Sequence, residues 1–438
     1  MNLALLGFLM VISFMTLIMT KRLSAVTALI LVPILFGLLA GAGPQLGGMI
    51  IKGVTQLAPT ALMLAFAVLY FGIMIDAGLF DPLVRMVLRT VGDDPVRVTV
   101  GTALLAIVVS LDGDGATTAL VTISALLPVY RRLKLNPLIL ALLLGLSNTI
   151  VNLTPWGGPT ARAATALHLE PSAVFVPMIP AMLIGLAGVL VMAWGLGRGE
   201  RKRLGRLSLQ PVSAGEGGDP RLDLAEDLTI KRPKLIWFNL VLTLALVAGL
   251  VTGLAPLPVL MMTAFAIAAI VNYPDIASQR KRVAAHANNV LGVVLLIFAA
   301  GAFTGILSGT GMVKAMADAT LVAIPPSLGP YLAPITALIS MPMTFFMSND
   351  AFYFGVLPVI AETAAKFGVP AEAIARASLI GQPVHGLSPL IAAIYLVTGL
   401  LKVEVGEAQR FSLKWAIAAC LLLLVAALVT GAFPLRAG

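Results

Sequence analysis

The sequence is poor in the residue types on which most soluble enzymes and binding domains depend. Only 11% of its 438 residues are charged, three are histidine, and one, Cys420, is cysteine. A soluble domain would carry about 25% charged residues. A single cysteine excludes a disulfide framework and a cysteine-ligated metal centre. The shortage of charge excludes an ordinary soluble domain, and with it the solvated basic face that a nucleic-acid partner requires.

Apolar residues are correspondingly abundant in the sequence. Hydrophobic residues make up 59% of the chain and the mean hydropathy is +1.01, which predicts a polytopic membrane protein. The first apolar run, Leu3–Met19, has no basic residue before it and is followed by Lys21 and Arg22. This order is the reverse of a cleavable signal peptide, so we expect a retained first span. We expect the third span at Pro59–Ile75, after a glycine-rich loop.

Two carboxylates interrupt the apolar pattern at Ser110–Thr118, which reads S-L-D-G-D-G-A-T-T. Asp112 and Asp114 stand between the apolar runs Val98–Val109 and Ala119–Val129. Each run is shorter than the roughly 20 residues that a helix needs to cross a bilayer. The pattern therefore predicts a re-entrant hairpin with an acidic tip, because charge at this depth is costly and marks a functional site.

A second polar tip, Ser348–Asp350, lies between Ile335–Phe346 and Ala351–Ile360. Each tip is followed by a helix that cannot stay continuous. The first breaks at Asn152–Pro159 (N-L-T-P-W-G-G-P) and the second at Gly381–Pro389, where prolines remove backbone donors and glycines relax the chain.

The two halves of the chain repeat one order of elements. Asn148 precedes Pro155 by seven positions, and Gln382 precedes Pro389 by seven. Each half is expected to cross the membrane five times. Because five is an odd number, the second half must be inverted in the membrane, a pattern typical of secondary transporters. We therefore predict an all-α fold of about ten spans, two hairpins and two broken helices. The expected parts are scaffold 1–97, transport part 98–197 (hairpin 98–130, broken helix 136–167), cytoplasmic linker 198–234, scaffold 235–330, and transport part 331–438 (hairpin 331–363, broken helix 371–400).

Non-helical backbone at membrane depth survives only where it lines a cavity, so the tips and breaks belong together. Carboxylates there suit protons or hard cations such as Mg²⁺ and Ca²⁺. The polar residues that we expect at this shared cavity are Asp112, Asp114, Thr117, Thr118, Asn148, Thr149, Thr154, Asn349, Asp350, His385 and Ser388.

Structural roles compete with these functional ones. The aspartates could cap the hairpins, His385 could be a satisfied core histidine, and His168 and His286 could lie at the interface. Arg162 and Arg376 would each pair with an aspartate by default, and a substrate carboxylate is the alternative partner. An intramembrane hydrolase with paired carboxylates is a further alternative that the inverted repeat disfavours.

At these motifs the sequence resembles the CitMHS family, bacterial citrate–divalent-metal:proton symporters of the ion transporter superfamily. The likeness extends over nearly the whole chain. The matching segments are Ser110–Thr118, Asn152–Thr160 (N-L-T-P-W-G-G-P-T), Ser348–Asp350 (S-N-D) and His385–Pro389 (H-G-L-S-P). By this resemblance, Ser147–Thr149 is similar to the Ser-Asn-Thr signature that relatives have near the carboxylate and the cation that they bind.

The resemblance implies proton-driven uptake of a citrate–metal complex by a homodimer in the bacterial inner membrane, with an elevator-type motion and no resident cofactor. Its partners would be that complex, protons and the lipid bilayer. Another organic anion such as gluconate, or cation/proton antiport, remains an alternative. On this hypothesis the substrate-binding residues are Asn148, Thr149, Thr154, Asn349, Ser388, Thr117, Thr118 and Arg162. The metal- or proton-coupling residues are Asp112, Asp114, Asp350 and His385.

Overall fold

A computed structural model describes residues 2–113, 115–204 and 230–437, and the side chain of Asp112 is outside the description. Asp114 and residues 205–229 of the predicted linker lie outside the described residues. The described part is all-helical, as predicted, with no strand in it. Five of its helices are long and apolar enough to cross a membrane: Gly43–Asp76, Pro171–Leu204, Pro233–Thr252, Ile276–Gly309 and Val405–Val429.

The first half begins with α1 (Leu3–Met19) and α2 (Ala25–Leu39). The prediction of a third span at Pro59–Ile75 was too short, because α3 runs unbroken over Leu46–Asp76 and contains Pro59. Proline in a helix interior removes one hydrogen bond, and the packing of α3 against its neighbours outweighs that loss. The amphipathic α4 (Asp81–Val91) follows.

The rest of the first half contains two helices joined by a short turn at the predicted tip, and then a helix interrupted at the predicted break. The hairpin is α5 (Pro95–Val109), a 3₁₀ turn (Ser110–Asp112) and α6 (Gly115–Arg132), and Gly113 at its tip has a left-handed φ of 79°. The broken helix is α7 (Pro137–Val151) and α8 (Gly158–Ala166). After α9 (Pro171–Phe175), α10 (Ile179–Leu204) extends beyond the start predicted for the linker at residue 198. The carboxylate of Glu200 in this extension accepts the Asn136 N–H, which holds the helix end in place.

The second half also contains long helices, two helices joined through a polar turn, and a broken helix. Its helices are α11 (Ile236–Thr252), α12 (Leu257–Asn272), α13 (Ile276–Gly309) and α14 (Met312–Ala323), then α15 (Leu332–Phe346), a π-helical segment (Ala351–Val356) and α16 (Leu357–Ala365). The second break separates α17 (Ala371–Ser378) and α18 (Gln382–His385) from α19 (Ala392–Leu401), and α20 (Val405–Val429) ends the chain. The glycine-rich stretch after α13 contains α14.

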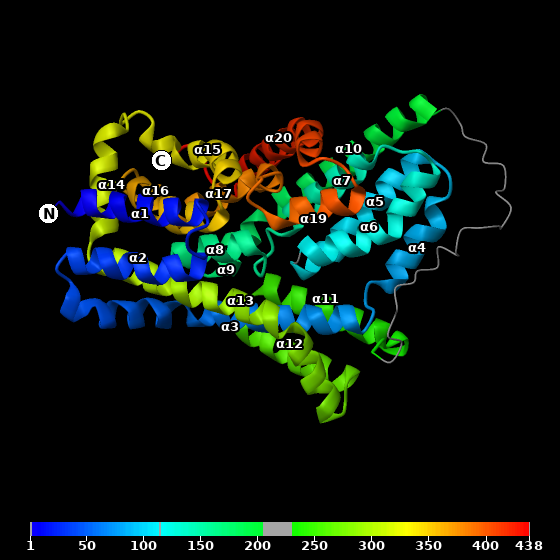
Figure 1. The fold of residues 1–438 in the computed structure, drawn as a ribbon, viewed down its shortest axis with the longest axis horizontal. Helices are drawn as coiled ribbons and strands as arrows, with labels where there is room; N and C mark the ends of the chain where they lie inside the picture. Colours follow the sequence, from blue (N-terminus) through cyan, green and yellow to red (C-terminus); the bar gives the residue numbers. More distant parts are fainter. Residues whose placement is uncertain (1, 114, 205–229, 438) are drawn as a thin grey trace.

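The helices divide into two groups that run along opposite edges of the molecule (Figure 1). The long helices α3 and α13 lie side by side along one edge with α11 and α12, whereas α15, α17 and α20 follow the other edge. The hairpin α5–α6 lies toward the end of the molecule reached by α10, and α15–α16 lies toward the end that holds both termini. The two hairpins therefore lie toward opposite ends of the molecule.

Candidate functional site

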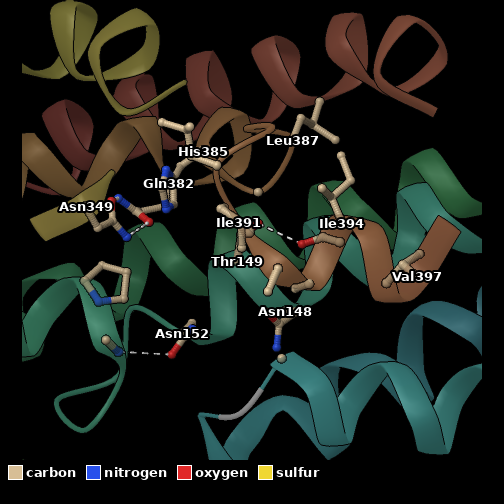
Figure 2. Close-up of a pocket in the computed structure, with 18 of the residues that line it drawn as sticks. Asn148, Thr149, Asn152, Asn349, Gln382, His385, Leu387, Ile391, Ile394 and Val397 are labelled. Carbon is tan, nitrogen blue, oxygen red and sulfur yellow. Dashed lines mark hydrogen bonds between the residues drawn. The ribbon is translucent and has the colours of Figure 1, made fainter. Parts of the chain in front are cut away.

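Residues from the tip and the break of each half line one cavity of about 430 Å³. Gly115 comes from the first hairpin, and Asn148, Asn152 and Arg162 flank the first break. The second half contributes its own tip and break: Ser348, Asn349, Asp350, Gln382, His385 and Gly386. An apolar wall from α7, α19 and α20 completes the cavity; Leu387, Ile391, Ile394 and Val397 stand on that side in Figure 2.

The first hairpin is tied to the first broken helix by a carboxamide. The Asn148 amide lies 3.3 Å from the Ser110 hydroxyl and 3.4 Å from the Thr118 hydroxyl, so it bridges the two arms of the hairpin. The Trp156 indole N–H donates to the Leu111 carbonyl over 2.9 Å. Side chains of the broken helix therefore hold the tip together with the hairpin's own bonds from the Gly113 N–H and the Thr118 hydroxyl to Ser110.

The second hairpin is held in a parallel way. Gln382 and Asn349 exchange amide hydrogen bonds of 3.2 and 3.3 Å, and the Gln382 amide also donates to the Tyr353 hydroxyl over 3.0 Å. Figure 2 shows Asn349 and Gln382 facing each other beside His385. Each half thus places a carboxamide just before its break and bonds it to its own hairpin.

One ion pair joins the two halves inside the cavity. The Arg162 guanidinium Nε lies 2.6 Å from the Asp350 Oδ1, although the two residues are 188 positions apart. Their side chains are 24% and 18% exposed, so the pair is shielded but still reached by solvent. A charge-assisted hydrogen bond of this kind is stronger than a neutral one. Arg162 therefore has an aspartate partner, as the default interpretation of the sequence expected.

The helix ends at the breaks add polarity to the cavity. Gly158 and Pro159 begin α8 at the cavity wall, and the Gly158 N–H donates to the Asn152 side chain over 3.3 Å. A helix N-terminus carries unpaired N–H groups and a partial positive charge, which favours anions. Together with Arg162, this end makes one side of the cavity suited to a carboxylate.

Six of the predicted site residues line the cavity: Asn148, Thr149, Arg162, Asn349, Asp350 and His385. Thr118 is buried behind Asn148, and the Ser388 hydroxyl donates to the Phe345 carbonyl over 2.7 Å away from the lining. Thr154 is buried and its hydroxyl has no partner among the described residues. Thr117 lines a different cavity, between α6 and the α3–α13 pair. Asp114 and the Asp112 side chain lie outside the described residues.

His385 lies at the cavity wall with its ring held by the main chain. Its Nδ1 is 2.6 Å from the Thr344 carbonyl, and the residue is only 8% exposed. This contact is the satisfied-core arrangement that the sequence left open, although the ring still borders the cavity.

Gln382, Asn152 and Ser348 also line the cavity and were not among the predicted site residues. The signal for Gln382 was present in the sequence, because it stands seven positions before Pro389 as Asn148 stands before Pro155. Within the described residues, no three or more His, Cys, Asp or Glu side chains gather as a metal site.

Comparisons with known proteins agree on one family. A family model described as CitMHS, citrate transporter, matches residues 5–381. A "Citrate transporter" of Bacillus subtilis is 55% identical over 98% of this chain and 99% of its own length. A second protein of that organism, "Mg(2+)/citrate complex secondary transporter", is 51% identical over 99% of both chains.

Solved structures are similar at the level of the fold. The YdaH transporter of Alcanivorax borkumensis matches with a TM-score of 0.59 and 16% identity, covering 90% of both chains. The MtrF transporter of Neisseria gonorrhoeae matches with a TM-score of 0.58 and 17% identity, covering 89% of this chain and 84% of its own. The chain therefore has the fold of a membrane transporter.

Proposed function

Because this chain belongs to the CitMHS family of citrate transporters, we propose that it carries citrate, complexed with Mg²⁺ or Ca²⁺, across the membrane in symport with protons. Members of this family are secondary transporters and not enzymes. The name of the second Bacillus relative supports a metal–citrate complex as the load.

The Arg162–Asp350 pair is the observation that supports the proposal most directly. It places a guanidinium and a carboxylate, one from each half, in a cavity that four carboxamide side chains also line. A guanidinium has five donors in a fork that matches a carboxylate, and Asp350 occupies the Nε donor. A citrate carboxylate would take Arg162 as its partner, and this would release Asp350.

The released Asp350 would then face the metal or accept a proton. Hard divalent cations take oxygen ligands, and citrate supplies several through its own carboxylates and hydroxyl. The Asn349 side chain, next to Asp350 in the same cavity, adds an amide oxygen. In this arrangement the first-half side binds the anion and the second-half tip binds the cation, so the cavity selects the complex over either ion alone.

The composition of the cavity lining favours an elevator-type motion. All its lining residues come from 115–162 and 348–412, inside the two predicted transport parts. The long helices α3 and α13 contribute none of them. A substrate bound entirely by one group of helices would move with that group relative to the other group.

Uptake into proteoliposomes tests the function. We expect labelled citrate to accumulate under an inward proton gradient when Mg²⁺ or Ca²⁺ is present, and EDTA to reduce uptake to the level of empty liposomes. Equal citrate uptake with and without metal would contradict the metal–citrate complex as the transported substrate. It would favour a transporter of another organic anion. Proton release driven by metal without citrate would favour cation/proton antiport.

A further inference from the structure

A cluster of ionisable side chains lies outside the central cavity, where the end of α3 meets the first turns of α13. The Asp76 Oδ2 atom is 3.0 Å from the His286 Nε2 and 3.3 Å from an Arg282 guanidinium nitrogen. The three side chains are 15%, 19% and 10% exposed. Arg282 and His286 are one turn apart on α13, so a single carboxylate reaches both.

The imidazole of His286 is seated on the main chain of α3. A Cβ atom built on Gly72, one turn before Asp76, would lie 2.7 Å from three atoms of the ring. Only a glycine leaves room for the imidazole at this position. The ring is therefore held between the Gly72 backbone and the Asp76 carboxylate, with Nε2 directed at the carboxylate.

A second cavity of about 420 Å³ opens beside this ring. His286, Asn288 and Asn289 give it a polar wall on α13, and Phe71 lies on the α3 side. Thr117, two residues after Gly115 of the central cavity, closes it from the first hairpin. The first hairpin thus borders the load cavity on one side and the His286 cavity on the other.

Histidine is the side chain whose unperturbed charge change falls between pH 5 and 8, and the chain has three. His385 bonds the Thr344 carbonyl, and the Nδ1 of His168 has no partner in the described part of the chain. Of the three, His286 is the one bonded to a carboxylate in the structure as described.

The charges around His286 come from several elements. Asp76 and Arg282 cancel, so the cluster is neutral with a neutral ring and carries one positive charge with a protonated ring. Beyond Asp76, the Arg232 guanidinium lies over the Tyr273 ring, and the Arg232 N–H donates to the Ala77 carbonyl. The groups that α6 and the second cavity add are uncharged: Thr117, Asn288 and Asn289.

We propose that His286 is a proton-binding site, and that its protonation strengthens binding of the anionic load at the neighbouring first hairpin. This inference rests on the proposed function for the identity of the load. Citrate with three ionised carboxylates and one divalent cation carries one negative charge, which a proton on His286 balances. By linkage, binding of the load would strengthen proton binding by the same factor.

Histidine NMR on the full-length protein in detergent tests the proton site without any transport assay. The three imidazole signals are assigned from His168→Gln, His286→Gln and His385→Gln variants. We expect the His286 signal of the unmodified protein to move reversibly as the pH is lowered. A His286 signal that does not respond to pH would overturn the proposal, whether or not the protein carries citrate.

Citrate exchange in proteoliposomes at equal pH on both sides tests the linkage. With the concentration of the Mg²⁺–citrate complex held constant, we expect the KM for citrate to rise about fivefold or more from pH 6 to pH 8. His286→Gln keeps a donor for Asp76 but cannot titrate, so its KM should be nearly independent of pH. His168→Gln is the matched control, because His168 does not line this cavity, and it should keep the wild-type profile. A wild-type profile in His286→Gln would overturn the linkage.

Discussion

At the scale of single residues, the molecule depends on charge pairs that cross between its halves. Arg162 with Asp350 joins the first break to the second hairpin, and His286 with Asp76 joins α13 to α3. Arg376, the other arginine near a break, instead donates to the Ala173 and Ala432 carbonyls. The sequence interpretation that gave Arg376 an aspartate by default was wrong, because each of its three guanidinium nitrogens donates to a main-chain oxygen.

Replacing Arg162 should weaken citrate binding more than it weakens the fold. Arg162→Gln keeps a polar side chain in the cavity but leaves Asp350 without its counter-ion. We expect the KM for metal–citrate uptake to rise about tenfold or more, which corresponds to roughly 1.4 kcal/mol or more of lost binding. Initial uptake rates measured over a range of citrate concentrations give this value.

Arg376→Gln is the matched control for that measurement. Because Arg376 holds α17 to Ala173 and to the segment after α20, its loss should lower the yield of folded protein. The KM of the protein that does fold should stay near the wild-type value. An unchanged KM in Arg162→Gln would argue against Arg162 as a ligand of citrate.

At the scale of elements, the crossing of α3 and α13 is built on small residues. A Cβ on Gly53 would lie 2.1 Å from the Gly301 carbonyl oxygen, and one on Gly305 would lie 2.4 Å from the Met49 carbonyl oxygen. The two backbones are therefore in direct contact, as is common where membrane helices pack through glycine. This contact makes the long pair a rigid support.

A larger side chain at Gly53 should separate the pair. The atoms in its way belong to the backbone of α13 and cannot rotate aside, so we expect Gly53→Leu to cost more than the about 1–3 kcal/mol typical of overpacking. The midpoint of thermal unfolding in detergent, followed by size-exclusion chromatography, should fall by several degrees.

Gly48→Leu, on the same helix, is the matched control. Nothing lies within 4 Å of a Cβ at Gly48, so this variant should unfold at nearly the wild-type temperature. Equal midpoints for the two variants would show that the close crossing contributes little to stability.

At the scale of the whole molecule, the proposed motion requires contacts that form and break between the two groups of helices. Phe71 on α3 and Trp156 in the first break have ring centroids 5.1 Å apart, a contact between the proposed scaffold and the proposed transport part. Phe66 and Phe265, on α3 and α12, have centroids 5.4 Å apart within the proposed scaffold. The ring centroids are at similar distances in the two contacts, but only the first contact would change during an elevator movement.

Cross-linking distinguishes the two contacts. In a Cys420→Ala background, which has no other cysteine, a short bifunctional thiol reagent that can be cleaved by reduction should join Phe71→Cys to Trp156→Cys. We expect citrate uptake to fall to background after cross-linking and to return after reduction. The pair Phe66→Cys and Phe265→Cys, treated in the same way, should keep its uptake. Full uptake with the first pair cross-linked would contradict the proposed movement.

Much of this arrangement was predictable because its signals are local. Two prolines and two glycines stand together at Asn152–Pro159 and interrupt the helix there, and a polar tip between two short apolar runs predicts a hairpin. The positions of Asn148, Asn349 and Asp350 at the cavity followed from these breaks. The third span was mispredicted because α3 keeps its helix across Pro59, where tertiary packing outweighs a local signal.

The sequence by itself determined that this chain is a helical membrane protein with polar tips and broken helices, because apolar run length and backbone chemistry act over a few residues. Only the tertiary structure decided which partners meet. It paired Arg162 with Asp350, brought Gln382 to the cavity and placed Thr117 opposite His286. Residues on one helix differ by about 100° in direction per position. The cavity that a side chain borders therefore depends on how distant helices pack, which no short stretch of sequence encodes.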